Sequence, residues 1–172
     1  VDFGGPVFDV AYSPDGKLMA SGAGVNAVVL NRVTGEKMFT LKGHSYFVKC
    51  IAFSPDGKCI ASGDDETVHI WDVVTMEKVC SLKHSKKMTC VTYSPDGKHI
   101  ASAHEDQTVK FWDCETMQEV CNLRESGSVL SFAYSRDSRS LASVSVDGTA
   151  KLWDLSGDTP VEKGTLKGHA DR

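Results

Sequence analysis

The chain of 172 residues repeats one pattern four times, at intervals of about 41 residues. Segments reading YSPDGK, FSPDGK, YSPDGK and the degenerate YSRDSR begin at Tyr12, Phe53, Tyr93 and Tyr134. A Trp-Asp pair recurs at 71–72, 112–113 and 153–154, and Leu30-Asn31 stands in its place in the first copy. Self-similarity at a fixed period of this length is typical of repeat architectures. The chain must therefore fold as a row of four similar units.

Each unit has the pattern of four short strands. In the second copy, VKCIAF (48–53) is rich in strand formers, and Ser-Pro-Asp-Gly then predicts a tight turn closed by glycine. KCIASG (58–63), TVHIWDV (67–73) and EKVCSLK (77–83) supply three more strands. Four strands per period without helical periodicity predict an all-β fold, a β-propeller of four-stranded antiparallel blades. The predicted repeats span residues 1–41, 42–82, 83–123 and 124–166, with 167–172 beginning a further repeat.

These landmarks resemble the WD-repeat (β-transducin-like) β-propeller family across essentially the whole chain. The shared motifs are LKGH at 41–44 and 166–169, the SPDGK turn, IAS after that turn, and the Trp-Asp pair. The first copy lacks the tryptophan, and the fourth lacks the turn proline and has Glu125 where the others have histidine. The resemblance implies a non-catalytic scaffold that binds a partner protein or peptide.

The resemblance also implies a buried hydrogen-bonded tetrad in each blade, running from Trp to Ser, Ser to His and His to Asp. A closed chain of donors and acceptors satisfies polar groups that are removed from water. The aligned residues are His44, Ser62, Asp65 and Trp71, then His84, Ser102, Asp106 and Trp112, then Ser143, Asp147 and Trp153. We expect these sets to fasten the loop before each inner strand to the turn between the middle strands.

Serine, histidine and aspartate are also the parts of a hydrolase triad, so a propeller enzyme is the competing hypothesis. A nucleophile needs exposure and an adjacent oxyanion hole, and a serine in the middle of a strand has neither. The sequence lacks a G-x-S-x-G turn, and the set occurs in several copies. We therefore expect no catalytic residue. His69 and His99 are predicted at the surface, and His104 in a solvated turn.

Composition narrows the partner classes further. The six cysteines form no C-x-x-C pair, and Cys50 and Cys90 recur with the repeat, so we expect structural thiols in a reducing compartment and neither metal nor cofactor. A cytoplasmic location follows, and a nuclear one is compatible. The net charge of −4 disfavours nucleic acid, and no apolar run is long enough to span a bilayer.

In the WD-repeat family the face that carries the tetrad turns is the binding surface. Carried over by register, the predicted partner-binding residues are Phe8, Phe47, Lys49, Asp64, Lys87, Thr89, Glu105 and Leu130. Aromatic residues and long cations are common interface anchors. Phe8 could equally pack within its blade, whereas Phe47 favours contact with a partner, and the lysines would suit an acidic peptide.

Four blades are fewer than the seven or eight with which the family closes a ring. The chain is therefore expected to be a piece of a longer propeller or to close as an eight-bladed homodimer, which we favour for the isolated chain. A second functional hypothesis makes it a sensor or regulatory fragment of a larger multidomain signalling protein. The propeller enzyme is the hypothesis with the least support.

Overall fold

The computed structural model describes residues 5–84, 86–157 and 159–168, and every element in these ranges is a strand. The first sheet holds β1 (Val10–Tyr12), β2 (Leu18–Ala23), β3 (Asn26–Asn31) and β4 (Lys37–Lys42). The second holds β5 (Cys50–Phe53), β6 (Cys59–Gly63), β7 (Thr67–Asp72) and β8 (Lys78–Lys83). The third holds β9 (Met88–Tyr93), β10 (His99–His104), β11 (Thr108–Asp113) and β12 (Glu119–Arg124). The fourth holds β13 (Val129–Tyr134), β14 (Ser140–Ser145), β15 (Thr149–Asp154) and β16 (Val161–Lys167).

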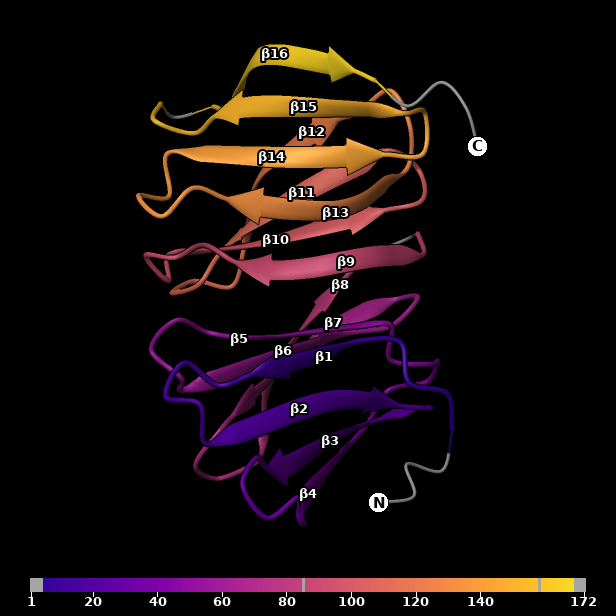
Figure 1. The fold of residues 1–172 in the computed structure, drawn as a ribbon, viewed down its shortest axis with the longest axis vertical. Coiled ribbons are helices and arrows are strands. Elements are labelled where there is room, and N and C mark those ends of the chain that lie inside the picture. Colours follow the sequence, from indigo (N-terminus) through magenta and orange to yellow (C-terminus); the bar gives the residue numbers. More distant parts are fainter. Residues whose placement is uncertain (1–4, 85, 158, 169–172) are drawn as a thin grey trace.

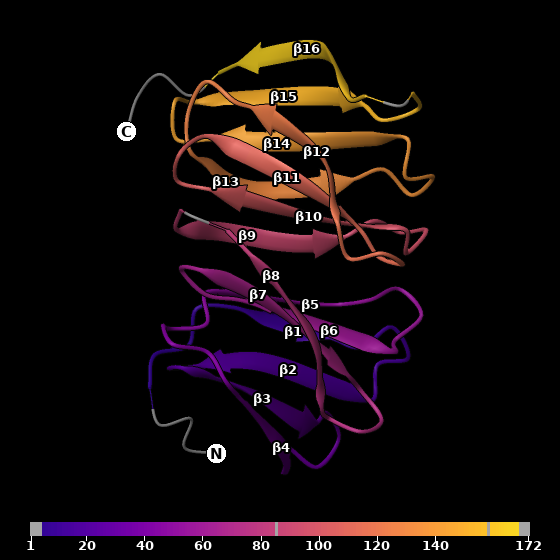
Figure 2. The ribbon, with the colours of Figure 1, turned by 180° about the vertical axis from the view of Figure 1, so that it is seen from behind.

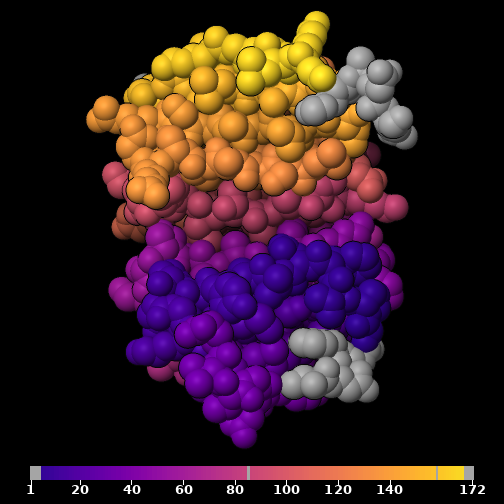
Figure 3. All heavy atoms as spheres, in the orientation of Figure 1, coloured from indigo at the N-terminus to yellow at the C-terminus, as the bar shows by residue number. Residues whose placement is uncertain are grey.

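The four sheets are antiparallel blades arranged in an open arc, which confirms the predicted all-β propeller architecture. The inner strands β1, β5, β9 and β13 contact one another in chain order. Figure 1 looks onto the side of the arc where these strands lie, and Figure 2, from behind, shows β8 and β12 in front. Figure 3, a space-filling view in the orientation of Figure 1, shows the blades stacked in sequence order. In this part of the chain no helix is long and apolar enough to cross a membrane.

Each blade begins with a hairpin whose turn chemistry explains the repeated SPDG motif. In the second blade Gly57 takes the left-handed conformation with φ of 73°, and its N–H donates to the Ser54 carbonyl at 2.9 Å. The Ser54 hydroxyl donates to Asp56 at 2.6 Å. In the fourth blade Ser138 takes the glycine position at φ of 60°, and its hydroxyl accepts the Asp96 N–H of the third blade. The degenerate turn thus gains a contact between blades.

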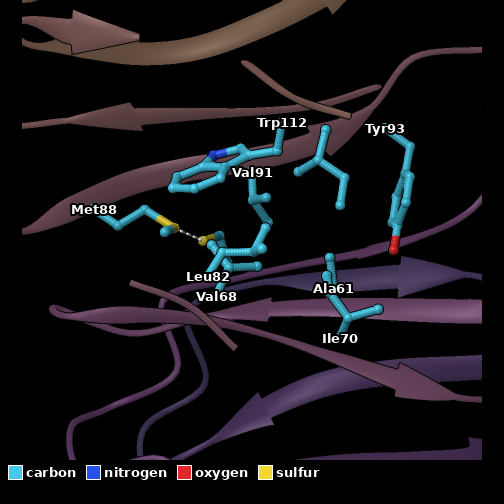
Figure 4. Packing of buried hydrophobic residues seen from close by; sticks show 10 residues of the cluster. Ala61, Val68, Ile70, Leu82, Met88, Val91, Tyr93 and Trp112 are labelled. Atoms are coloured by element: carbon cyan, nitrogen blue, oxygen red, sulfur yellow. Dashed lines mark hydrogen bonds between the residues drawn. The ribbon is translucent and has the colours of Figure 1, made fainter. Parts of the chain in front are cut away.

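The hydrophobic core lies between blades and follows one rule at each junction. The tryptophan-bearing face of each later blade packs on the alanine-bearing face of the blade before it. Figure 4 shows Trp112 and Tyr93 of the third blade over Ala61 and Ile70 of the second. Burying one such aliphatic or aromatic side chain contributes about 1.5–3 kcal/mol. Packing between neighbours therefore holds the arc together.

Within residues 5–84, 86–157 and 159–168, no blade packs on the alanine-bearing face of the fourth blade. Val144, Leu152 and Leu166 on this face are 42%, 44% and 76% exposed. The strand register places the following residues on it: Ser131, Ala133, Ala142, Val144, Ala150, Leu152, Gly164 and Leu166. These residues are uncharged, and the paired strand ends Ser140 and Asp154 lie on the same face, so the face is apolar apart from that end.

Candidate functional site

The second blade contains a set of four buried side chains that connects three of its segments. Trp71 Nε1–H on β7 donates to Ser62 Oγ on β6 at 2.7 Å. Ser62 Oγ also forms a hydrogen bond with His44 Nε2, 2.6 Å away. His44 Nδ1 then lies 3.0 Å from a carboxylate oxygen of Asp64. The four side chains are buried.

The sequence predicts Asp65 in this set, and the structure corrects that assignment to Asp64. Asp64 is only 1% exposed, so the prediction that it contacts a partner is also wrong. One of its oxygens accepts the backbone N–H groups of Glu66 and Thr67, which turns the other toward His44. Asp65 instead lies 2.5 Å from Lys49 Nζ. Two adjacent aspartates look alike in sequence, and the turn geometry selects the first.

Hydrogen bonds favour the ionised form of the buried Asp64 carboxyl. Burial acts to raise the pKa of this carboxyl, but hydrogen bonds from His44, Glu66 and Thr67 outweigh it and hold the pKa well below its usual range. His69 also belongs to this buried region, because its ring lies 4.2 Å from that of His44 and its Nε2 contacts the Gly43 carbonyl at 3.0 Å. The prediction that His69 is a surface residue is therefore wrong.

The third blade replaces the carboxylate with a second imidazole. Trp112 Nε1–H donates to Ser102 Oγ at 3.0 Å, and Ser102 contacts His104 Nε2 at 3.1 Å. His104 follows Ser102 by two residues, as Asp64 follows Ser62, and it is 1% exposed rather than in a solvated turn.

The remaining predicted members of the third set have other partners. His84 has its Nδ1 on the Lys86 carbonyl at 2.7 Å and its ring 4.5 Å from that of His104. Asp106 accepts the hydroxyl and the N–H of Thr108. The predicted link from Ser102 through His84 to Asp106 is therefore wrong, because His104 occupies the position between Ser102 and the loop.

In the fourth blade Glu125 takes the place of the histidine that contacts the serine. Its Oε1 accepts Trp153 Nε1–H at 3.0 Å and the Ser143 hydroxyl at 2.5 Å, and Lys151 Nζ lies 3.5 Å from Oε2. Asp147, predicted in this set, is exposed and accepts the Ser126 hydroxyl, so that assignment is wrong. The longer glutamate reaches both donors directly and leaves no place for a separate aspartate.

Four of the predicted contact residues meet at one hollow on the inner strands. Phe8, Lys49, Thr89 and Leu130 occupy equivalent positions in the four blades and line a cavity of about 330 Å³. Phe8 and Leu130 are 55% and 56% exposed. Because the inner strands of successive blades lie side by side, residues about 41 apart in sequence become neighbours around this cavity.

The other predicted contact residues lie outside the hollow. Phe47 is half exposed, with its ring 6.2 Å from that of Phe8. Lys87 and Glu105 are exposed and adjacent, since Glu105 N–H donates to the Lys87 carbonyl at 2.8 Å. The loop end of the propeller therefore presents two regions, one around the hollow and one on the third blade.

Sequence reasoning missed three exposed apolar residues beside Phe8 and Phe47. Val7, Val25 and Tyr46 are between 40% and 49% exposed. With Phe8 and Phe47 they form what we call the apolar loop patch. A comparison of the repeats could have found them, because the third copy has Lys86 at the position of Tyr46 and Gln107 at the position of Val25. The repeat itself therefore does not require apolar residues there.

The cysteines are free, and burial governs their chemistry. Burial raises the pKa of Cys90 and of Cys114 to about 12, so both thiols stay protonated near neutral pH. Within the described ranges no three His, Cys, Asp or Glu side chains come together as metal ligands.

A comparison with protein families shows which family the chain belongs to. The family described as the IFT122 first beta-propeller matches residues 6–172. The chain belongs to this family. A search of curated proteins returned no match. The resemblance to WD-repeat propellers is thereby confirmed, and the IFT122 propeller family makes the chain a scaffold-type segment of a larger protein.

Proposed function

We propose that this chain is a non-catalytic interaction scaffold that binds a protein or peptide partner at the loop end of the propeller. The observation that carries the proposal is the hollow formed by Phe8, Lys49, Thr89 and Leu130. Concave sites of roughly 300–1,000 Å³ are typical binding sites. One bulky side chain of a partner would fit in a cavity of this size.

The buried serines support a structural role in place of a catalytic one. Ser62 and Ser102 are completely buried and Ser143 is 2% exposed. Each is engaged by a tryptophan N–H and by a histidine or glutamate. A nucleophile has to reach its substrate, and these hydroxyl groups are closed off from it. The sets hold the binding loops in place.

The ion pair of Lys49 argues against recognition of an acidic peptide in the hollow. Lys49, the only cation among the residues that line the hollow, is held 2.5 Å from Asp65. Its charge is therefore already balanced before a partner arrives. Phe8 and Leu130 are left as the exposed anchors of the cavity.

The proposal is tested by selecting random-sequence peptides, displayed on phage, against the 172-residue chain. Selected peptides should lose binding to the variants Leu130→Lys and Thr89→Lys, which alter the hollow. They should retain binding to Val79→Lys, a matched control because Val79 on the outer strand β8 is 57% exposed. Peptides that bind all three variants equally would contradict the proposal, as would a selection that enriches none.

A further inference from the structure

The apolar loop patch lies at the junction of the first two blades and shares one residue, Phe8, with the hollow. Its members come from three segments: the approach to β1, the β2–β3 turn and the β4–β5 loop. All five are large apolar residues between 40% and 55% exposed: Val7, Phe8, Val25, Tyr46 and Phe47. Contiguous apolar surface of this kind on a soluble fold is often functional.

Backbone hydrogen bonds hold the three segments of the patch together. Gly24 N–H donates to the Pro6 carbonyl at 3.1 Å, and Val48 N–H donates to the Gly24 carbonyl at 2.8 Å. The rings of Phe8 and Phe47 are 6.2 Å apart and tilted by 32°. The patch is therefore preorganised, and a partner would lose little entropy of the protein by binding it.

The repeat architecture does not require apolar residues at these positions. The positions of Tyr46 and Phe47 are Lys86 and Lys87 in the third blade. The position of Val25 is Glu66 in the second blade, Gln107 in the third and Gly148 in the fourth. The same loops thus fold with polar residues, so the apolar set at the first junction calls for a separate explanation.

Negative charge borders the patch. The turn 64–66 carries three successive carboxylates: Asp64 is buried against His44, and Asp65 is paired with Lys49. Glu66 accepts the hydroxyl of Tyr46 at 3.0 Å and forms no ion pair within the described residues. The hydrogen bond to Glu66 and its charge raise the pKa of Tyr46. A partner reaching the patch therefore meets an unbalanced carboxylate at its edge.

We propose that the apolar loop patch docks a partner segment that combines a bulky apolar side chain with a lysine or arginine. The apolar side chain packs on Phe8 and Phe47, and the cation pairs with Glu66. Charge complementarity at Glu66 selects a basic segment over an acidic one. This inference rests on the proposed scaffold function and deepens it, because it names the partner chemistry and adds a second contact region beside the hollow.

The test uses the phage-selected peptides and their synthetic, fluorescently labelled forms, with affinity measured by anisotropy. The enriched sequences should contain a bulky apolar residue close to Lys or Arg. Phe47→Ser and Glu66→Lys should each weaken binding by about tenfold, the loss expected when one interface anchor is removed. The matched controls Val120→Ser (Val120 is 55% exposed) and Glu115→Lys, both distant in the third blade, should bind as the original chain does.

A charge exchange sharpens the test. A peptide whose basic residue is replaced by glutamate should bind Glu66→Lys better than it binds the original chain. Enrichment of acidic peptides, or unchanged affinity for Phe47→Ser, would overturn the inference. Loss of binding to Leu130→Lys but not to Phe47→Ser would refute the patch alone and leave the scaffold function standing. Peptides insensitive to every loop-end variant would contradict both.

Discussion

His44 Nδ1 and a carboxylate oxygen of Asp64 lie 3.0 Å apart, with both side chains fully enclosed. This contact ties the β4–β5 loop to the β6–β7 turn, and Ser62 and Trp71 extend the connection to the middle strands. In the third blade His104 contacts the serine, and in the fourth blade Glu125 does so. The stability of the loop end therefore depends on different chemistry in each blade.

Replacing Asp64 with alanine should destabilise the fold strongly. Removal of one partner of a buried pair leaves the other polar group uncompensated, which costs about 3 kcal/mol. Asp65→Ala, the neighbouring control, removes a partly exposed ion pair and should cost less than about 1 kcal/mol. Urea unfolding followed by tryptophan fluorescence measures both values. Equal losses for the two variants would argue against the assignment of Asp64.

Removing the indole N–H of Trp71 should also lower stability. Trp71→Phe deletes the donor to Ser62 and leaves a smaller ring in the core between the first and second blades. The lost hydrogen bond alone is worth about 1 kcal/mol, and the cavity adds to it. A melting temperature unchanged from that of the original chain would show that the set contributes nothing to folding.

Acid should destabilise the third blade. Burial, together with the adjacent His84, lowers the pKa of His104 from 6.5 to about 4. A histidine with a depressed pKa in the folded state binds more protons when unfolded, so its stabilisation is complete above pH 6.5 and is lost as the pH falls toward 4. Complete protonation of His104 should lower the free energy of unfolding by about 3 kcal/mol. Burial lowers the pKa of His84 as well, so the two imidazoles act in the same direction.

This pH dependence is measured by thermal unfolding between pH 4 and 7, values that bracket the folded and unfolded pKa. His104→Gln keeps a polar side chain without a titrating group and should flatten the slope of stability against pH. His99→Gln is the control, because His99 lies on the same strand and is only partly buried. A slope that is the same in the original chain and in His104→Gln would contradict the prediction.

The open face of the fourth blade should promote self-association of the isolated chain. Alanine-bearing faces pack on the tryptophan-bearing face of the next blade at all three internal junctions. The corresponding face of the first blade has Leu30 in place of the tryptophan and exposes Val10 and Tyr12. We propose a two-fold homodimer that closes an eight-bladed ring. Light scattering should give a dimer mass, and Leu152→Lys should give a monomer. Val79→Lys, on an outer strand, should remain dimeric, and a monomeric original chain would refute this proposal.

The repeat period by itself determined the architecture of this protein. A turn such as Ser54-Pro-Asp-Gly57 encodes its own backbone geometry, and a short run of apolar and small residues such as CIASG is typical of a strand buried on both faces, so local chemistry is enough to predict four-stranded blades. The sequence also shows which residues occupy equivalent positions in the four inner strands, because register follows directly from the repeat. These residues are Phe8, Lys49, Thr89 and Leu130.

Only the tertiary structure decided which polar groups pair. Asp64 and Asp65 are adjacent, and their roles depend on which carboxylate the turn directs inward. His104 is the side chain that contacts the serine in the third blade, and Glu125 is the one in the fourth. Each is identified by its distance from the serine and not by its residue type. The apolar loop patch likewise arises where segments distant in sequence converge on Gly24. Contacts of this kind depend on the relative position of loops in space, which a pattern read along the chain does not contain.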